Sequence, residues 1–273
     1  NVINILFHGQ GNIFQQFYNT VDSIVVGNFV GKEALAAVGS VGPVINSLIG
    51  FFMGLATGAG VVISQAYGAK RSEKVSRTVH TTLVLTFVLC VVFSVVGILI
   101  TPWMLRLMST PEDVFAQSAE YLKIYFAGVS GLMIYNMGSG ILRAVGDSKR
   151  PLYFLIFSAC LNTVLDLVFV AGMDMGIAGA AWATVIAQVS SAILVLIVLM
   201  RSDGSYQLKI HELRVEIPII KEIVRIGFPA ALQQMITSFS NVFVQSYING
   251  FGSSVMAGWS AYSKIDQFLM LPM

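Results

Sequence analysis

Apolar runs long enough to cross a membrane recur along the whole chain of 273 residues. A bilayer core about 30 Å thick is spanned by about 20 apolar residues in an α-helix. Short polar loops separate the runs. We therefore expect an all-α, polytopic membrane protein with helices near 10–30, 36–66, 79–101, 117–142, 151–172, 177–200 and 223–249, and an eighth helix beginning near 254.

Composition supports this class and excludes others. Charged residues make up 11% of the chain and hydrophobic residues 56%, whereas soluble domains carry about 25% charged residues. The net charge of +2 is too small, and too dispersed among loops, to suggest a nucleic-acid partner. Cys90 and Cys160 lie in apolar segments without partner spacing, so we expect neither a disulfide nor a zinc site. The histidines fit no metal-ligand spacing and receive no role: His8, His80 and His211.

The basic residues predict the orientation in the membrane. Most of the 16 Lys and Arg residues lie in three loops, at 70–77, 143–150 and 201–225, which follow the second, fourth and sixth expected helices. Cytoplasmic loops carry an excess of Lys and Arg. We therefore expect these three loops, and the N-terminus, to be cytoplasmic.

A weak internal repeat predicts the domain organisation. Residues 21–31 line up with residues 242–252, and six expected helices separate the two copies, so both enter the membrane in the same sense. The simplest completion is about twelve helices in two parallel six-helix halves, of which this chain is a truncated part. We expect an N-terminal six-helix lobe at 1–200, a cytoplasmic connection at 201–222, and the start of a C-terminal lobe at 223–273.

Two carboxylates are expected at membrane depth, Asp22 and Asp166. A charged side chain there costs about 2.5–3.5 kcal/mol on insertion scales and marks a functional candidate. Other polar side chains recur at helical spacing, which places each set on one helix face. These sets are Gln15 and Asn19 with Asp22; Ser158 and Asn162 with Asp166; Thr184, Gln188 and Ser191; and Tyr121 with Tyr125.

Such a constellation has two readings. Carboxylates, an amide and a hydroxyl in a low-dielectric interior can hold a proton or a hard cation such as Na⁺, because oxygen ligands suit hard cations. Alternatively, the polar groups join helices by hydrogen bonds, above all Gln15, Asn19, Ser158 and Gln188. Gly54, Gly58 and Gly60 predict close helix packing. Lys264 and Asp266 fit either an ion pair or a substrate contact.

An ordered set of motifs resembles the multidrug and toxic compound extrusion (MATE) family of transporters. The resemblance runs along essentially the whole chain. Its motifs are Tyr18-Asn-Thr-Val-Asp-Ser-Ile-Val-Val-Gly27, Gly31-Lys-Glu-Ala-Leu-Ala-Ala-Val-Gly39, Gln65-Ala-Tyr-Gly-Ala69, Arg143-Ala-Val-Gly-Asp-Ser-Lys-Arg-Pro151 and Asn162-Thr-Val-Leu-Asp166.

The resemblance implies a prokaryotic cytoplasmic-membrane antiporter without a cofactor. It would export amphipathic, often cationic drugs in exchange for H⁺ or Na⁺, by alternating access and as a monomer. The coupling cation would be held by the residues that match the family site: Asp22, Asn162, Asp166, Thr184 and Tyr121. Substrate-cavity candidates are Gln15, Asn19, Gln188, Gln234, Asn241, Lys264 and Asp266.

One departure from the family pattern indicates which branch of the MATE family the sequence resembles. Some members carry a further acid in helix seven, whereas this sequence has none between Arg225 and Lys264. The helix-seven face is neutral instead, with Gln234, Thr237, Asn241 and Gln245. The resemblance therefore favours members of the DNA-damage-inducible type, which couple through the N-terminal lobe alone.

Three other functions remain as alternatives of unequal weight. A lipid-linked oligosaccharide flippase of the same superfamily would need basic residues in its cavity to hold a pyrophosphate, whereas here they lie almost entirely in loops, Lys264 excepted. An intramembrane enzyme would need a catalytic motif, and neither a His-Glu-x-x-His nor a paired-aspartate motif is present. A passive channel would not need paired acids.

Overall fold

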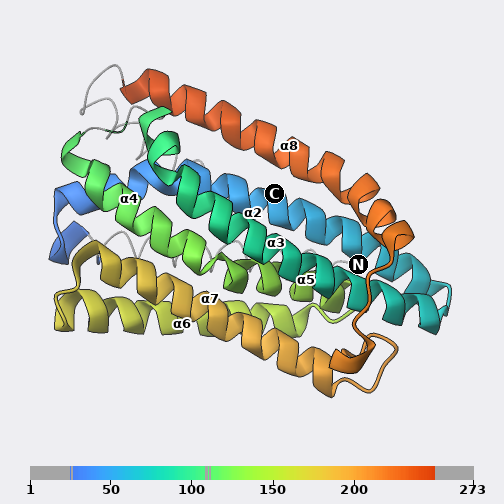
Figure 1. The fold of residues 1–273 in the computed structure, drawn as a ribbon. Helices are drawn as coiled ribbons and strands as arrows, with labels where there is room; N and C mark the ends of the chain where they lie inside the picture. The colour runs from blue at the N-terminus through green and yellow to red at the C-terminus, as the bar shows by residue number, and fades with distance from the viewer. Residues whose placement is uncertain (1–24, 26, 108–109, 111, 250–273) are drawn as a thin grey trace, which may run out of the picture.

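The computed structural model describes residue 25 and residues 27–107, 110 and 112–249, and this part of the chain is helical without a strand. Its elements are α2 (Lys32–Gly68), α3 (Ser72–Leu107), α4 (Glu112–Ala127), α5 (Val129–Ala144), α6 (Lys149–Asp166), the π-helix η1 (Leu167–Gly172), α7 (Gly176–Arg201), the short 3₁₀ helix η2 (Ile210–Glu212) and α8 (Ile217–Asn249) (Figure 1). The all-α prediction is confirmed. The first expected helix lies mostly, and the eighth entirely, outside the described residues.

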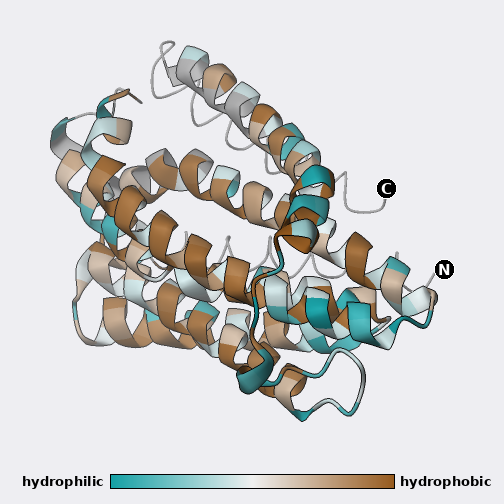
Figure 2. Ribbon diagram, turned by 45° about the vertical axis from the view of Figure 1, so that its right-hand side comes forward, coloured by the Kyte–Doolittle hydropathy of each residue, from teal (hydrophilic) through white to brown (hydrophobic). Residues whose placement is uncertain are grey.

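Four described segments are long and apolar enough to cross a membrane. They are Val44–Gly68, Ser72–Leu107, Lys149–Gly172 and Gly176–Arg201. A bilayer core needs about 20 residues of helix, and several of these elements are longer. The surplus turns carry the charged residues at the ends, and Figure 2 shows hydrophobic helix bodies with hydrophilic ends and loops.

The helix expected at 117–142 is interrupted at one residue, Gly128, which divides it into α4 and α5. A side chain there would meet α7: an added Cβ would lie 2.2 Å from Val185 Cγ1. Gly128 thus lets α7 approach the α4–α5 junction closely. The apolar pattern of the segment runs through this turn without a change of period, so the pattern could not reveal it.

The helix expected at 151–172 changes from an α-helix to a π-helix after Asp166. It is α-helical to Asp166 and continues as the π-helix η1, whose wider turn ends with Met173 N donating to Val168 O at 2.9 Å. Asp174 then takes a left-handed conformation, with φ of 52°. Short π-helical turns inside α-helices frequently occur at functional sites.

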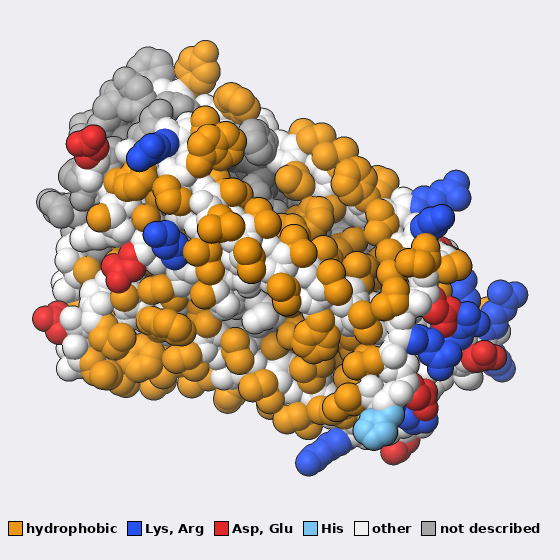
Figure 3. Space-filling view, in the orientation of Figure 1, with side chains coloured by type: hydrophobic (Ala, Val, Ile, Leu, Met, Phe, Trp, Pro, Cys, Tyr) orange, Lys and Arg blue, Asp and Glu red, His pale blue; other side chains and the backbone are white. Residues whose placement is uncertain are grey.

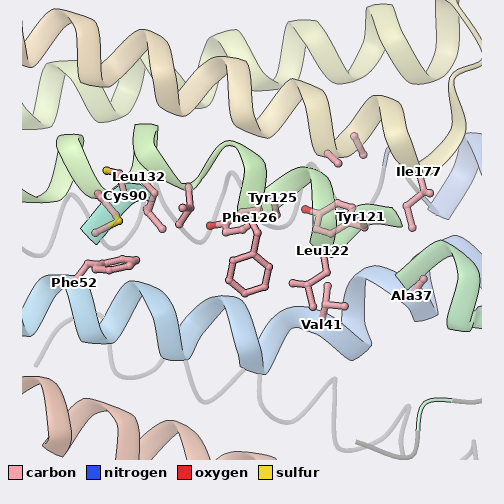
Figure 4. Packing of buried hydrophobic residues seen from close by; sticks show 14 of the residues in the cluster. Ala37, Val41, Phe52, Cys90, Tyr121, Leu122, Tyr125, Phe126, Leu132 and Ile177 are labelled. Atoms are coloured by element: carbon pink, nitrogen blue, oxygen red, sulfur yellow. The ribbon is translucent and has the colours of Figure 1, made fainter. Parts of the chain in front are cut away.

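Helices α4 and α5 form the centre of the described bundle. Their buried side chains pack between α2 on one side and α7 on the other, and Figure 4 shows Phe52, Val41 and Leu122 in this layer beside Tyr121 and Tyr125. Two smaller clusters lie towards the end where α3 begins, one of them shared by α2, α5 and α8. The core therefore surrounds α4 and α5, while α3 and α6 expose apolar residues such as Leu99 and Phe157.

The most extensive helix pair in the described part is α2 with α8. The two backbones touch at glycines: an added Cβ at Gly54 would lie 2.4 Å from Ala231 Cα, and one at Gly58 would lie 2.6 Å from Gly227 Cα. The prediction that Gly54 and Gly58 serve close helix packing is confirmed. Gly60 is less crowded, because a Cβ added there would lie 3.5 Å from its nearest neighbour, Gly140 O.

Basic and acidic side chains gather at one end of the face drawn in Figure 3, beside a broad hydrophobic surface. The connection between α7 and α8, residues 202–216, hereafter the strap, belongs to this end. The strap docks on α3 and α7: His80 Nε2 accepts from the Lys209 backbone N–H at 3.0 Å, and Leu208 N donates to Leu199 O at 2.9 Å. His80, to which the sequence assigned no role, therefore holds the strap in place.

The tautomer of His80 follows from its partners. Its Nδ1 lies 2.7 Å from Ser76 O, a carbonyl to which it must donate, which leaves Nε2 as the acceptor for the strap. His80→Leu removes that acceptor and buries an unpaired N–H. We expect the strap to be cleaved by trypsin, at Lys209 or Arg214, severalfold faster in inside-out vesicles. His211→Ala is the control, because His211 is exposed, and equal cleavage of both variants would contradict the assignment.

Candidate functional site

The acid–amide pair of α6 lies within the bundle. Asn162 and Asp166 are four residues apart, one turn along the same face of α6. Asp166 has 0% exposure and Asn162 has 1%, although other side chains of α6, among them Phe157 and Val164, are exposed. A buried carboxyl group in a membrane helix is costly unless it is paired, protonated or occupied by a cation.

Helix α7 supplies the third member of the site. Thr184 is buried and lies against Asn162, with the Asn162 side-chain amide 3.2 Å from Thr184 Oγ1. The α7 backbone approaches easily here because it is rich in small residues, among them Ala180, Ala181 and Ala183. Three of the five expected cation-site residues are thus brought together from two helices.

The neighbours of the Asn162 amide fix its orientation. Its nitrogen donates to Asp166 Oδ2 at 2.9 Å, and its oxygen accepts from Thr184 Oγ1 at 3.2 Å and from Thr184 N at 3.1 Å. This pattern fits an ionised Asp166. The reverse orientation would set the amide nitrogen against the Thr184 backbone N–H and the amide oxygen against a carboxylate oxygen, and is therefore unfavourable.

The Thr184 hydroxyl has a second neighbour on its own helix. Thr184 Oγ1 lies 3.1 Å from Ala180 O, one turn back on α7. Its single proton can be donated either to that carbonyl or to the Asn162 oxygen. The arrangement thus links the buried carboxyl group of Asp166 to α7 through one amide.

A second polar pair lies one turn along α7. Gln188 Nε2 lies 3.4 Å from Tyr125 OH, and Tyr125 stacks on Tyr121 with ring centroids 6.5 Å apart. Both tyrosines are buried in the central core (Figure 4). Gln188 Oε1 is buried without a hydrogen-bond partner in the described structure. Tyr121 and Gln188 therefore lie among the same helices as Asn162.

The other candidates divide into two groups. Gln234 is exposed on α8, where its Cβ would be 3.0 Å from a Cβ added at Gly50 of α2. The remaining predicted residues lie outside the described residues or have side chains that are not described: Asp22, Gln15, Asn19, Asn241, Lys264 and Asp266. Their membership of a site stays a prediction.

The sequence missed the charged contacts between α3 and the start of α8. Lys74 and Arg77, one turn apart on α3, pair with Glu222 and Glu216. The available signal was charge complementarity, since two bases at one helix start face two acids at the start of another. No group of three or more His, Cys, Asp or Glu side chains in the described residues could hold a metal ion.

Comparison with known proteins places the chain in a family. The sequence profile of the MatE family matches residues 10–168, more than half of the chain. A protein of Bacillus subtilis (strain 168), described as "Probable multidrug resistance protein YoeA", is 34% identical over 268 residues. The match covers 96% of this chain and 58% of that protein. The chain thus spans a little over half of that relative.

Two solved structures give the fold. The outward-facing conformation of a multidrug resistance MATE family transporter of the MOP superfamily matches with a TM-score of 0.89 and 27% identity, covering 99% of this chain and 60% of that one. An inward-facing conformation with the same description matches with a TM-score of 0.79 and 29% identity, covering 85% and 53%. The family profile, the relative and the helical architecture agree, and the chain belongs to the MATE family.

Proposed function

We propose that the whole protein to which this chain belongs exports amphipathic or cationic drugs in antiport with H⁺ or Na⁺. The observation that carries the proposal is the buried Asp166, which accepts a hydrogen bond from the Asn162 amide. A purely structural polar contact between α6 and α7 would need no carboxyl group, because Asn162 and Thr184 already join the two helices. The names of the relatives, which refer to multidrug resistance, support the substrate class.

The proposed cycle depends on the charge of Asp166. With the cavity open outward, a proton or Na⁺ reaches Asp166, together with Asp22 of the first expected helix, and neutralises the local charge. Helix one then repacks, and drug leaves the lobe. Return to the inward-open state releases the cation to the cytoplasm. A charge that moves inward contributes about 2.3 kcal/mol per 100 mV of membrane potential.

The organisation around this site follows the same proposal. Residues 1–200 form the first lobe, 201–222 the cytoplasmic connection, and 223–273 the start of the second lobe, with the N-terminus in the cytoplasm of a prokaryotic cell. The charged end of the molecule, where α3, the strap and α8 begin, would face the cytoplasm, in keeping with the positive-inside rule. All the expected cation-site residues belong to one chain, so we propose that a monomer suffices for transport.

Reconstitution of the full-length protein tests this function. Proteoliposomes loaded with the fluorescent cation ethidium are given an imposed Na⁺ gradient or an imposed pH gradient, each alone. We expect saturable ethidium efflux with one gradient and little without it. Equal flux in the absence of any gradient would indicate a channel, and no flux under either gradient would overturn the proposal.

Thr184→Val tests the contribution of the α7 hydroxyl. Valine keeps the shape but cannot bond to Asn162, and one hydrogen bond contributes about 0.5–1.5 kcal/mol. We expect the half-saturating concentration of the driving cation to rise about three- to tenfold, since 1.4 kcal/mol is a factor of ten. Thr184→Ser should restore it.

Thr163→Val is the matched control for this variant. Among the residues that the structure describes, Thr163 Oγ1 bonds to Ala159 O alone, one turn back on its own helix, at 3.0 Å. An unchanged cation dependence in Thr184→Val, or the same change in Thr163→Val, would exclude a specific role of Thr184.

A further inference from the structure

Helices α2 and α8 meet at Gly54, Gly58, Gly227 and Ala231, hereafter the glycine seam. Backbone atoms make these contacts. Beyond the Gly54 and Gly58 contacts, an added Cβ at Gly58 would lie 2.5 Å from Ile223 O, and one at Gly227 would lie 3.1 Å from Leu55 Cα. Backbones in direct contact have no flexible side chains that could follow a movement. Dispersion attraction falls steeply with separation, so a gap of about 0.5–1 Å between the two helices would already forfeit a quarter to a half of the attraction at each contact.

Two ion pairs flank the seam, and they differ in character. Lys74 Nζ lies 3.1 Å from Glu222 Oε2, and both side chains are more than a third exposed, at 38% and 37%. Exposed pairs of this kind contribute little and break readily. This contact joins α3 directly to α8.

The second pair is bidentate and better enclosed. Arg77 donates to both carboxylate oxygens of Glu216, with Nε to Oε1 at 2.6 Å, and the Glu216 side chain is only 14% exposed. Hydrogen bonds from Arg77 lower the pKa of Glu216, so this carboxylate stays ionised at neutral pH and the pair is lost only in acid. Glu216 is the last residue before α8.

The strap that leads to Glu216 is fixed to the same helix. Besides the His80 contact with Lys209, Thr81 Oγ1 donates to Arg214 O at 3.3 Å, and Leu208 is buried in the cluster that contains Leu83 and Leu199. The strap is therefore part of the first lobe up to its last residue. Movement of α8 relative to α2 must begin after Glu216.

The opposite end of α8 is separated from the described lobe. Figures 1 and 2 show α8 close to α2 near its start and diverging from it towards its C-terminal end. Phe243, Val244 and Tyr247 are exposed there, Tyr247 by 78%. The better match to an outward-facing than to an inward-facing transporter agrees with this geometry.

We propose that α2 and α8 form the cytoplasmic gate, with Glu216 as its pivot. The Lys74–Glu222 pair and the glycine seam at Gly54, Gly58, Gly227 and Ala231 close the gate in the outward-facing state. They separate in the inward-facing state, while the Arg77–Glu216 pair stays intact. This proposal rests on the alternating access of the proposed function. It adds that α8 moves relative to α2 and that the Arg77–Glu216 contact stays fixed.

Cross-linking distinguishes the gate from the pivot. In a full-length background with Cys90→Ala and Cys160→Ala, a short bis-methanethiosulfonate reagent, which joins two thiols by disulfides that a reductant cleaves, is applied to K74C/E222C or to R77C/E216C. Cross-linked K74C/E222C should lose more than 90% of gradient-driven ethidium export and recover it on reduction. Cross-linked R77C/E216C should keep at least half, because its bond replaces a contact that never opens.

Thiol labelling gives a readout that does not depend on export. Ile223 is fully buried against the seam, so Ile223→Cys in the same background reports opening to a membrane-impermeant maleimide in inside-out vesicles. Adding Lys74→Gln should raise the labelling rate at least threefold. Arg150→Gln is the control and should not change it, because Arg150 pairs with Asp147 within one loop at 3.3 Å.

The outcomes separate this proposal from the proposed function. Export that survives the K74C/E222C cross-link, or that is lost equally in R77C/E216C, overturns the gate and pivot assignment. Labelling that Lys74→Gln leaves unchanged overturns it as well. A protein without gradient-driven export in any form contradicts antiport, and in that case the labelling comparison still decides the gate.

Discussion

Asp166→Asn in the full-length protein is expected to abolish drug export while membrane expression stays normal. Asparagine has nearly the same shape and can still bond to Asn162, so the packing of α6 against α7 should survive. It carries no ionisable group, so binding of H⁺ or Na⁺ could no longer neutralise a charge at this position. The measurement is ethidium efflux from proteoliposomes under imposed Na⁺ and pH gradients, normalised to the amount of folded protein.

Asp174→Asn is the matched control for the loss of Asp166. Asp174 follows η1, is exposed, and has a left-handed backbone that asparagine adopts readily. Export should be unaffected there. Export that persists in Asp166→Asn would show that the buried carboxyl group is not the coupling site, whereas loss in both variants would point to damage around η1.

Gly131→Leu is expected to destabilise the first lobe more than any conservative substitution on its surface. An added Cβ at Gly131 would lie 2.7 Å from Val189 N and 2.9 Å from Gln188 C, and neither is a side chain that can move aside. Overpacking of a dense core costs about 1–3 kcal/mol or more. We expect the apparent midpoint of thermal unfolding in detergent to fall by several degrees, and the displaced α7 to move Thr184 and Gln188.

Gly68→Ala provides the comparison for this substitution. Gly68 ends α2, and an added Cβ there would meet no described atom within 4 Å. Alanine is also the better helix former by about 1 kcal/mol. Its midpoint should be unchanged or slightly raised, and an equal fall in both variants would argue against the α5–α7 contact as the cause.

Much of the fold could be predicted because each membrane helix is marked by a local run of about 20 apolar residues. The helices expected at 36–66 and 177–200 differ from α2 and α7 by a few residues at each end. The helix expected at 79–101 was too short, since α3 runs from Ser72 to Leu107. Hydropathy marks where a helix leaves the lipid, whereas hydrogen bonding decides where it ends, and charged residues such as Glu73 and Arg106 continue the helix beyond the apolar part.

The site could be predicted in part for the same reason. The four-residue spacing of Asn162 and Asp166 is a local property, and their shared face is confirmed by the structure. The contact with Thr184 crosses two helices and was supplied by the family resemblance rather than by spacing. The turn at Gly128 and the His80 contact depend on neighbours distant in sequence, Val185 and Lys209, and no local pattern encodes them.

The docking of the strap also has a consequence for biosynthesis. Every surface that holds the strap belongs to a helix that the ribosome has already made: His80 and Thr81 on α3, and Leu199 on α7. Domains of a growing chain generally fold in order from the N-terminus. The strap can therefore close the first lobe as soon as it emerges, and α8 would be delivered to a partner that is already assembled.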